Sequence, residues 1–295
     1  MADLIAGHIT QPLIDLWSKE GDEFMMNYWL MGSPLSMATA ILLVFLTVYV
    51  VAPRYAKSLA GYDLKPVMLI ANGTVFGIVG MGWLIGLYLT NFASDGLRCD
   101  GSFPRDTDLR TSALKMIAFM YVMTKLLEFQ RPIFASLRGS SASDHYKSLA
   151  YNMYLLGQLT MSYIGGVFYP GGPLVIWPMT DAVVMIVGYG YLVLRLATPA
   201  LHPSPTWIKI VSVMRFLTSF ILMVHAYLFS FTCAMTSSKL AYLLNIAFYY
   251  NAALVTAQLF SFLVGDRRPD LVTRPPLKTP CDDGNNNACT RIQGH

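Results

Sequence analysis

Long apolar runs follow one another along almost the whole chain, with short polar segments between them. Each run has about 18 residues or more, which is enough for a helix to cross the hydrocarbon core of a bilayer. In lipid only helices and closed barrels satisfy their backbone hydrogen bonds, so the runs are predicted to be helices. They cover residues 35–52, 66–93, 111–129, 148–169, 174–194, 210–235 and 240–264.

This pattern predicts an all-α, polytopic membrane protein with seven transmembrane helices. Residues 1–34 are expected to form an N-terminal luminal or extracellular segment, and residues 35–265 the membrane domain. Residues 266–295 are rich in Pro, Asp, Asn and Gly, a composition typical of a disordered tail. The prediction therefore places one membrane domain over nearly the whole chain.

Composition agrees with a membrane location. Only 13% of the 295 residues are charged, whereas soluble domains carry about 25%. The mean hydropathy is +0.48. The net charge of +4 is spread along the chain, so the sequence predicts no nucleic-acid partner.

The basic residues predict the orientation, because cytosolic loops of membrane proteins are enriched in Lys and Arg. Thirteen of the 21 basic residues fall in the loops after the first, third and fifth runs or in the C-terminal tail, and five fall on the opposite side. The remaining three lie within runs. The N-terminus is therefore predicted to be luminal and the C-terminus cytosolic.

Ionisable residues inside the runs are candidates for a functional role, since they are costly in a membrane. Lys125 and Glu128 share one helical face; they form either a neutralised pair or the lining of a polar cavity open to the cytosol. Asp181 and Arg215 form either a buried ion pair between helices or a site where Arg215 binds a phosphate or anionic headgroup. His225 is either a hydrogen-bonded interior residue or a ligand.

Other polar positions are less specific. Asn152 lies in the fourth run, where it could join helices by a hydrogen bond or line a pocket. No two histidines have the spacing of metal ligands, and the chain has no phosphate-cradling glycine-rich loop. The sequence therefore predicts no metal site and no bound cofactor.

Several short motifs occur in an order that resembles the very-long-chain fatty acid elongase (ELO) family. They are Trp-Leu-Met-Gly-Ser-Pro-Leu at 29–35, Ala-Pro-Arg-Tyr at 52–55, Leu-Lys-Pro at 64–66 followed by Asn72, Lys-Leu-Leu-Glu-Phe at 125–129, and Leu137-Arg138. The motif at 125–129 resembles the first half of the family's K-x-x-E-x-x-D-T, and the resemblance extends over about residues 28–268. It implies seven spans, a location in the endoplasmic reticulum and the condensation of malonyl-CoA with a long-chain acyl-CoA, which releases CO₂ and gives a 3-oxoacyl-CoA.

The chain departs from the family at the positions that carry this chemistry. Arg131-Pro132 stands where the motif has D-T. The family's H-x-x-H-H box falls on 148–152, so its histidines are replaced by Ser148, Tyr151 and Asn152, and a further histidine in the fifth span is replaced by Met185. Imidazole suits proton transfer because its pKa lies near neutrality. The replacements lack this property.

The resemblance also implies a disulfide. Under the predicted orientation Cys99 and Cys233 lie on the luminal side, where disulfides persist, and family members carry a cysteine pair at similar places. A Cys99–Cys233 disulfide is therefore expected. Cys281 and Cys289 lie in the tail and are expected to stay reduced.

The leading hypothesis is an elongase-family protein whose condensation chemistry is lost or greatly weakened, a pseudoenzyme that keeps an acyl-CoA or lipid pocket or associates with active elongases. Its catalytic residues are then undefined, and Lys125, Glu128, Asn152, Asp181, Arg215 and His225 are its substrate-binding candidates. One alternative is an active very-long-chain 3-oxoacyl-CoA synthase with a displaced mechanism, for which His225 is the candidate base. Another is a seven-helix receptor or scaffold.

Overall fold

Helices account for the described part of the chain. The computed structural model describes residues 15, 17–19, 21–56, 58, 63–92, 94, 109–138, 149–168, 172–198, 205–233 and 238–265. The helices are α3 (Glu23–Met26), α4 (Pro34–Leu46), α5 (Ala52–Ala56), α6 (Lys65–Leu89), α7 (Leu109–Leu127), α8 (Gln130–Arg138), α10 (Leu149–Phe168), α11 (Ile176–Ala197), α12 (Pro205–Cys233) and α13 (Ser238–Gly265). A π-helical turn, η2 (Thr47–Val51), joins α4 to α5, and a 3₁₀ turn, η5 (Gly172–Val175), precedes α11.

The chain divides into two compact units, Met1–Leu254 and Val255–His295. The second unit begins inside α13, and its described part is the end of that helix. The predicted tail, 266–295, lies outside the described residues. The packing, cavities and site described below all belong to the first unit.

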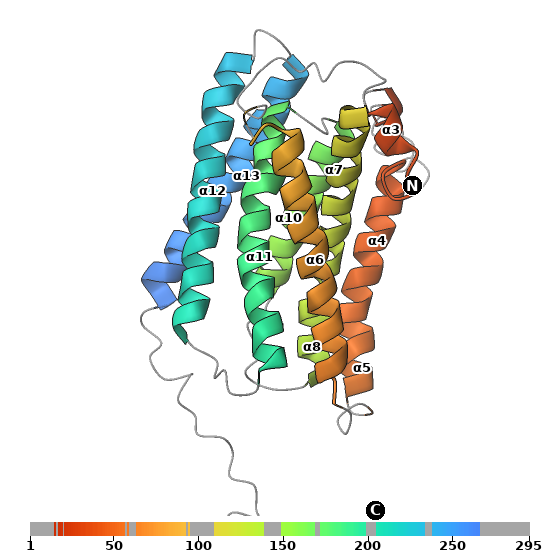
Figure 1. The fold of residues 1–295 in the computed structure, drawn as a ribbon, viewed down its shortest axis with the longest axis vertical. Helices are drawn as coiled ribbons and strands as arrows, with labels where there is room; N and C mark the ends of the chain where they lie inside the picture. Colours follow the sequence, from red (N-terminus) through yellow and green to blue (C-terminus); the bar gives the residue numbers. More distant parts are fainter. Residues whose placement is uncertain are drawn as a thin grey trace, which may run out of the picture. The chain divides into compact units, whose positions relative to one another are not determined.

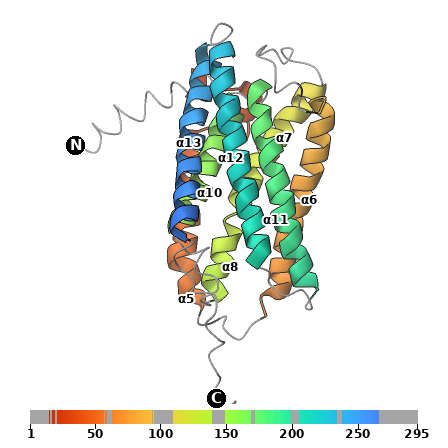
Figure 2. The ribbon, with the colours of Figure 1, turned by 90° about the vertical axis from the view of Figure 1, so that its left-hand side faces the viewer.

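In the first unit the long helices run side by side, as Figures 1 and 2 show. α11 packs against α6 and α12, while α7 packs against α6 and α10. Prolines mark several helix starts: Pro34 follows the N-cap Ser33, Pro66 lies in the first turn of α6, and Pro205 begins α12. Proline suits the first turn because its missing N–H has no partner there in any case.

Five helical segments are long and apolar enough to cross a membrane by composition alone, which makes the chain a multi-pass membrane protein. They are Pro34–Ala56, Lys65–Leu89, Ile176–Ala197, Lys209–Cys233 and Ala241–Phe260. Five of the seven predicted transmembrane helices are thus supported. The other two predicted spans are helices, α7 and α10, but polar residues such as Lys125 and Asn152 lower their apolar content. These side chains are buried, so the polar residues of α7 and α10 face the interior of the protein.

The N-terminal segment packs onto the bundle. Trp17 is buried, donates from Nε1 to the Met31 carbonyl at 2.9 Å and stacks on Tyr163 of α10. Asp22 caps α3 and forms an ion pair with Lys115 of α7 at 2.8 Å. Lys115, a charge in the third predicted span, is thereby neutralised at the end of the bundle where α7 begins.

Gly157 of α10 permits close packing against α13. A Cβ at this position would lie 2.8 Å from ring atoms of Tyr250, closer than side chains tolerate without displacement. We expect Gly157→Ala to lower the free energy of unfolding by about 1–3 kcal/mol, because an overpacked rigid ring forces the helices apart. Thermal unfolding in one detergent measures this. Gly165→Ala on the same helix meets open space and is the control. Its free energy of unfolding should rise by about 0.5–1 kcal/mol, because alanine favours the helix over glycine. Equal effects of the two substitutions would contradict the packing argument.

Cys233 at the end of α12 is disulfide-bonded. Its partner lies outside the described residues, as does Cys99, so the Cys99–Cys233 pairing stays a prediction. We expect peptide mapping under non-reducing conditions to recover the two cysteines in one cross-linked species. Recovery of Cys99 as a free thiol, or of Cys233 joined to Cys281 or Cys289, would contradict it.

Candidate functional site

A buried ionic cluster lies at the end of α7. The Lys125 ammonium donates to Glu128 Oε2 at 2.9 Å and also pairs with Asp181 Oδ2 of α11. The Tyr121 hydroxyl donates to the same Asp181 oxygen at 2.8 Å. The side chains of Lys125 and Glu128 are 2% and 5% exposed, so one ammonium lies between two carboxylates away from solvent. The expected Lys125–Glu128 pair is confirmed.

Pro132 explains why the helix breaks at Glu128. A proline ring clashes with the carbonyl four residues before it and cannot donate a hydrogen bond, and that carbonyl belongs to Glu128. The helix accordingly breaks at Glu128-Phe129, between α7 and α8. The Glu128 carbonyl instead accepts from the Arg131 backbone N–H at 3.2 Å. Pro132 therefore accounts for the boundary between α7 and α8.

Two guanidinium groups lie over aromatic rings beside the cluster. The Arg131 guanidinium carbon is 3.8 Å from the ring centre of Tyr189. The Arg215 guanidinium carbon is 5.9 Å from that of Tyr151 and 5.5 Å from that of Tyr154. Such contacts stabilise a cation by about 0.5–2 kcal/mol. The hypothesis of an Asp181–Arg215 ion pair is wrong, because the Asp181 carboxylate pairs with Lys125 instead.

These side chains surround a small polar cavity. Its lining is Lys125, Glu128, Arg131, Tyr154, Asp181, Val184, Met185 and Arg215. The cavity measures about 10 Å³, and roughly 10–15 Å³ is the least that holds one water. Three cationic and two anionic side chains line it, so its fixed charges leave an excess of positive charge. The cavity can therefore attract an anionic group.

Two residues that the resemblance places at the family's histidine box are buried in the bundle. Tyr151 and Asn152 are buried on α10, and the Asn152 amide donates to the Tyr49 hydroxyl of η2 at 2.9 Å. Met185 lines the polar cavity and packs against Val75 and Tyr189. Ser148 lies outside the described residues.

His225 lies apart from the cluster. It stacks on Phe229 with ring centres 4.4 Å apart and is absent from the lining of the polar cavity. Ten residues separate it from Arg215 on α12, which is about 15 Å along a helix. The structure therefore brings together four of the candidate residues, Lys125, Glu128, Asp181 and Arg215, and leaves His225 elsewhere.

Sequence reasoning did not single out Tyr121, Arg131 or Tyr49. Tyr121 lies one helical turn before Lys125, so its place on the same face could have been inferred from the i, i+4 spacing. The roles of Arg131 and Tyr49 depend on Tyr189 and Asn152, which are distant in sequence. No local signal in the chain indicates those contacts.

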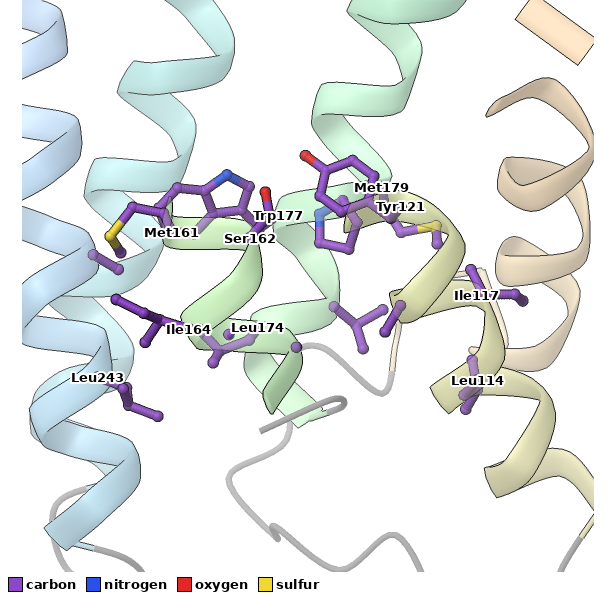
Figure 3. A pocket seen from close by; sticks show the side chains of 16 residues that line it. Leu114, Ile117, Tyr121, Met161, Ser162, Ile164, Leu174, Trp177, Met179 and Leu243 are labelled. Carbon is purple, nitrogen blue, oxygen red and sulfur yellow. The ribbon is translucent and has the colours of Figure 1, made fainter. Parts of the chain in front are cut away.

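A second cavity, apolar and larger, lies along the same helices. It measures about 70 Å³ and is lined by α7 from Leu114 to Tyr121, the end of α10, η5, the start of α11 and residues Leu243 and Ala247 of α13. Figure 3 shows Trp177, Met179 and Tyr121 toward one end of the lining and Leu114 and Leu243 toward the other. Ligand sites are typically apolar with a few placed polar groups, and Ser162 and the tyrosine supply those here.

Together the fold and the two cavities define a helical membrane protein with one apolar and one polar cavity among its helices. The model of the ELO family, described as GNS1/SUR4, matches residues 29–263. The chain is also 24% identical over 289 residues to very long chain fatty acid elongase 7 of Drosophila melanogaster, covering 95% of this chain and 80% of the relative. The chain therefore belongs to the ELO family, whose resemblance the short motifs had indicated, and is a membrane protein of fatty acid elongation.

Proposed function

We propose that this family member binds an acyl-CoA or a related acyl lipid but has lost, or retains only weakly, the family's condensation chemistry. One observation carries the proposal: the polar cavity that gathers Lys125, Glu128, Asp181 and Arg215 has Met185 in its wall, and its described lining contains no histidine. The binding groups remain, while a base of suitable pKa is missing at that place.

The two cavities have the polarity that the two ends of such a ligand require. The excess positive charge of Arg131, Arg215 and Lys125 over two carboxylates suits an anionic head, and guanidinium groups bind phosphate and carboxylate by paired hydrogen bonds. The apolar cavity suits a hydrocarbon chain, whose burial contributes about 0.8 kcal/mol per CH₂. An amphipathic ligand with its anionic head at the polar cavity and its chain in the apolar cavity therefore matches the polarity of both cavities.

Mass spectrometry of lipids that co-purify with the protein tests the proposal. We expect an acyl-CoA or fatty acyl species with the wild type and with Gly165→Ala. Gly165 lines the apolar cavity and has open space at its Cβ position, so Gly165→Phe should fill the cavity and remove the bound chain. A wild type that carries no acyl lipid would contradict the proposal and favour a receptor or scaffold.

We further propose that all seven predicted helices cross the membrane of the endoplasmic reticulum with the N-terminus luminal. The asymmetry of thirteen basic residues against five supports this orientation. It puts the polar cavity toward the cytosol, where α7 ends, and the apolar cavity toward the lumen.

Tags at the two ends test the orientation. In cells whose plasma membrane alone is permeabilised, a tag at residue 2 should be protected from antibody and one at residue 295 should be accessible. Full permeabilisation should expose both. The reverse pattern of protection would exclude the orientation, and exposure of both tags in the first condition would exclude an odd number of crossings.

A further inference from the structure

The apolar and polar cavities follow one another along the same helices. On α7 the apolar cavity is lined from Leu114 to Tyr121, and the polar cavity begins at Lys125. On α11 the corresponding change falls between Met179 and Asp181. On α10 the order is reversed along the chain, as an antiparallel neighbour requires. Tyr154 lines the polar cavity, and the apolar cavity is lined by Met161, Ser162, Ile164, Gly165 and Gly166.

Tyr121 stands at the boundary. Its ring lines the apolar cavity and also a third cavity, of about 30 Å³, beside α6. Its hydroxyl donates to Asp181, which lines the polar cavity. The Tyr121 ring therefore contacts the apolar cavity, while its hydroxyl is bonded to a residue of the polar cavity.

Lys125 fixes this arrangement. Its ammonium pairs with the Asp181 carboxylate and lies 5.3 Å from the ring centre of Tyr121. Tyr121 and Lys125 both belong to α7, and Asp181 belongs to α11, so the three groups form a cross-link between the two helices. Tyr121 lines the apolar cavity, and Lys125 and Asp181 line the polar one.

We propose that Tyr121, held by Asp181 and Lys125, is a partition that an acyl chain must displace to pass from the polar cavity into the apolar one. Tyr121 is then a specificity-determining residue: it acts on ligands whose chain is long enough to reach past it and leaves shorter chains unaffected. This inference rests on the proposed acyl-lipid function. Its ligand class is a single hydrocarbon chain with an anionic head, as the charge excess of the polar cavity indicates.

The Tyr121→Phe variant isolates the partition. It keeps the ring but removes the hydrogen bond to Asp181, and a bond to a charged group changes an equilibrium by roughly ten- to a hundredfold. Since the bond opposes displacement of the ring, its loss should favour the open arrangement. Tyr163→Phe is the matched control: Tyr163 is also a buried tyrosine of the bundle, and its hydroxyl donates to the carbonyls of Leu30 and Ser33 and lies outside both cavity linings.

The experiment is equilibrium binding of oleoyl-CoA and octanoyl-CoA to the detergent-purified full chain. We expect Tyr121→Phe to bind oleoyl-CoA roughly tenfold more tightly than the wild type and octanoyl-CoA with unchanged affinity. Tyr163→Phe should change neither. A structural role alone would shift both ligands together.

The outcomes separate the partition from the function on which it rests. Binding by the wild type that Tyr121→Phe leaves unchanged, weakens, or alters equally for both ligands would overturn the partition and leave the proposed function standing. Binding of oleoyl-CoA by Tyr121→Phe with none by the wild type would support a closed partition. Failure of the wild type and of both variants to bind either ligand would overturn the partition and the proposed function together.

Discussion

Purified protein supplied with malonyl-CoA and a long-chain acyl-CoA is expected to form little or no 3-oxoacyl-CoA. Loss of a general acid or base costs roughly 10²–10⁴ in rate. The resemblance places Ser148, Tyr151 and Asn152 at the positions of the histidine box and Met185 at the position of the remaining histidine. The Asn152 amide is engaged with Tyr49. We therefore expect a rate at least about a hundredfold below that of a family member with an intact box.

Mass-spectrometric detection of the 3-oxoacyl-CoA product, with an intact-box elongase as positive control, measures this rate. Robust condensation by the wild type would contradict the expectation and support the displaced mechanism. The His225→Ala variant would then show whether His225 is the catalytic base that replaces the box histidines. Loss of activity would assign the base to His225, about 15 Å along α12 from Arg215, and survival would assign the chemistry to groups at the polar cavity.

The positions of the helices could be predicted because apolar runs of membrane length leave few other structures open to the backbone. The predicted run 174–194, for example, corresponds to α11, Ile176–Ala197. The helices α4 and α5 and the turn η2 between them correspond to one predicted run, whose pattern does not indicate the π turn. Pro53 explains this turn: it withholds the N–H that would have bonded the carbonyl of Tyr49, and the helix widens over Thr47–Val51.

The pairing of charges within the site was harder to predict. Lys125 and Glu128 are local, and their spacing alone places them together. Asp181 had two possible cationic partners on other helices, Lys125 and Arg215. The sequence does not show which of their helices brings its cation next to Asp181. The structure resolves it through the packing of α11 on α6 and of α7 on α6, which brings Lys125 to Asp181. Arg215 then lies over two tyrosines instead.

Replacement of Lys125 by Met is expected to destabilise the protein by about 3–5 kcal/mol. Removing one partner of a buried ion pair leaves an uncompensated charge, and here two carboxylates, Glu128 and Asp181, would share a buried site without their ammonium. Met has similar length and keeps the apolar contacts of the lysine stem. Thermal and chemical unfolding in one detergent, calibrated against the wild type, measure the loss.

Two further variants show whether charge is the cause. Asp181→Asn should cost clearly less, because Lys125 keeps Glu128 at 2.9 Å and the amide oxygen can still accept from Tyr121. A triple variant, Lys125→Met with Glu128→Gln and Asp181→Asn, removes the three charges of the cluster and leaves Arg131 and Arg215 over their aromatic rings. Since well-packed neutral replacements of buried ion pairs are often neutral in stability, it should recover at least about half of the loss. A triple variant as unstable as Lys125→Met would show instead that the shape of the lysine side chain, and not its charge, stabilises the junction of α7 and α11.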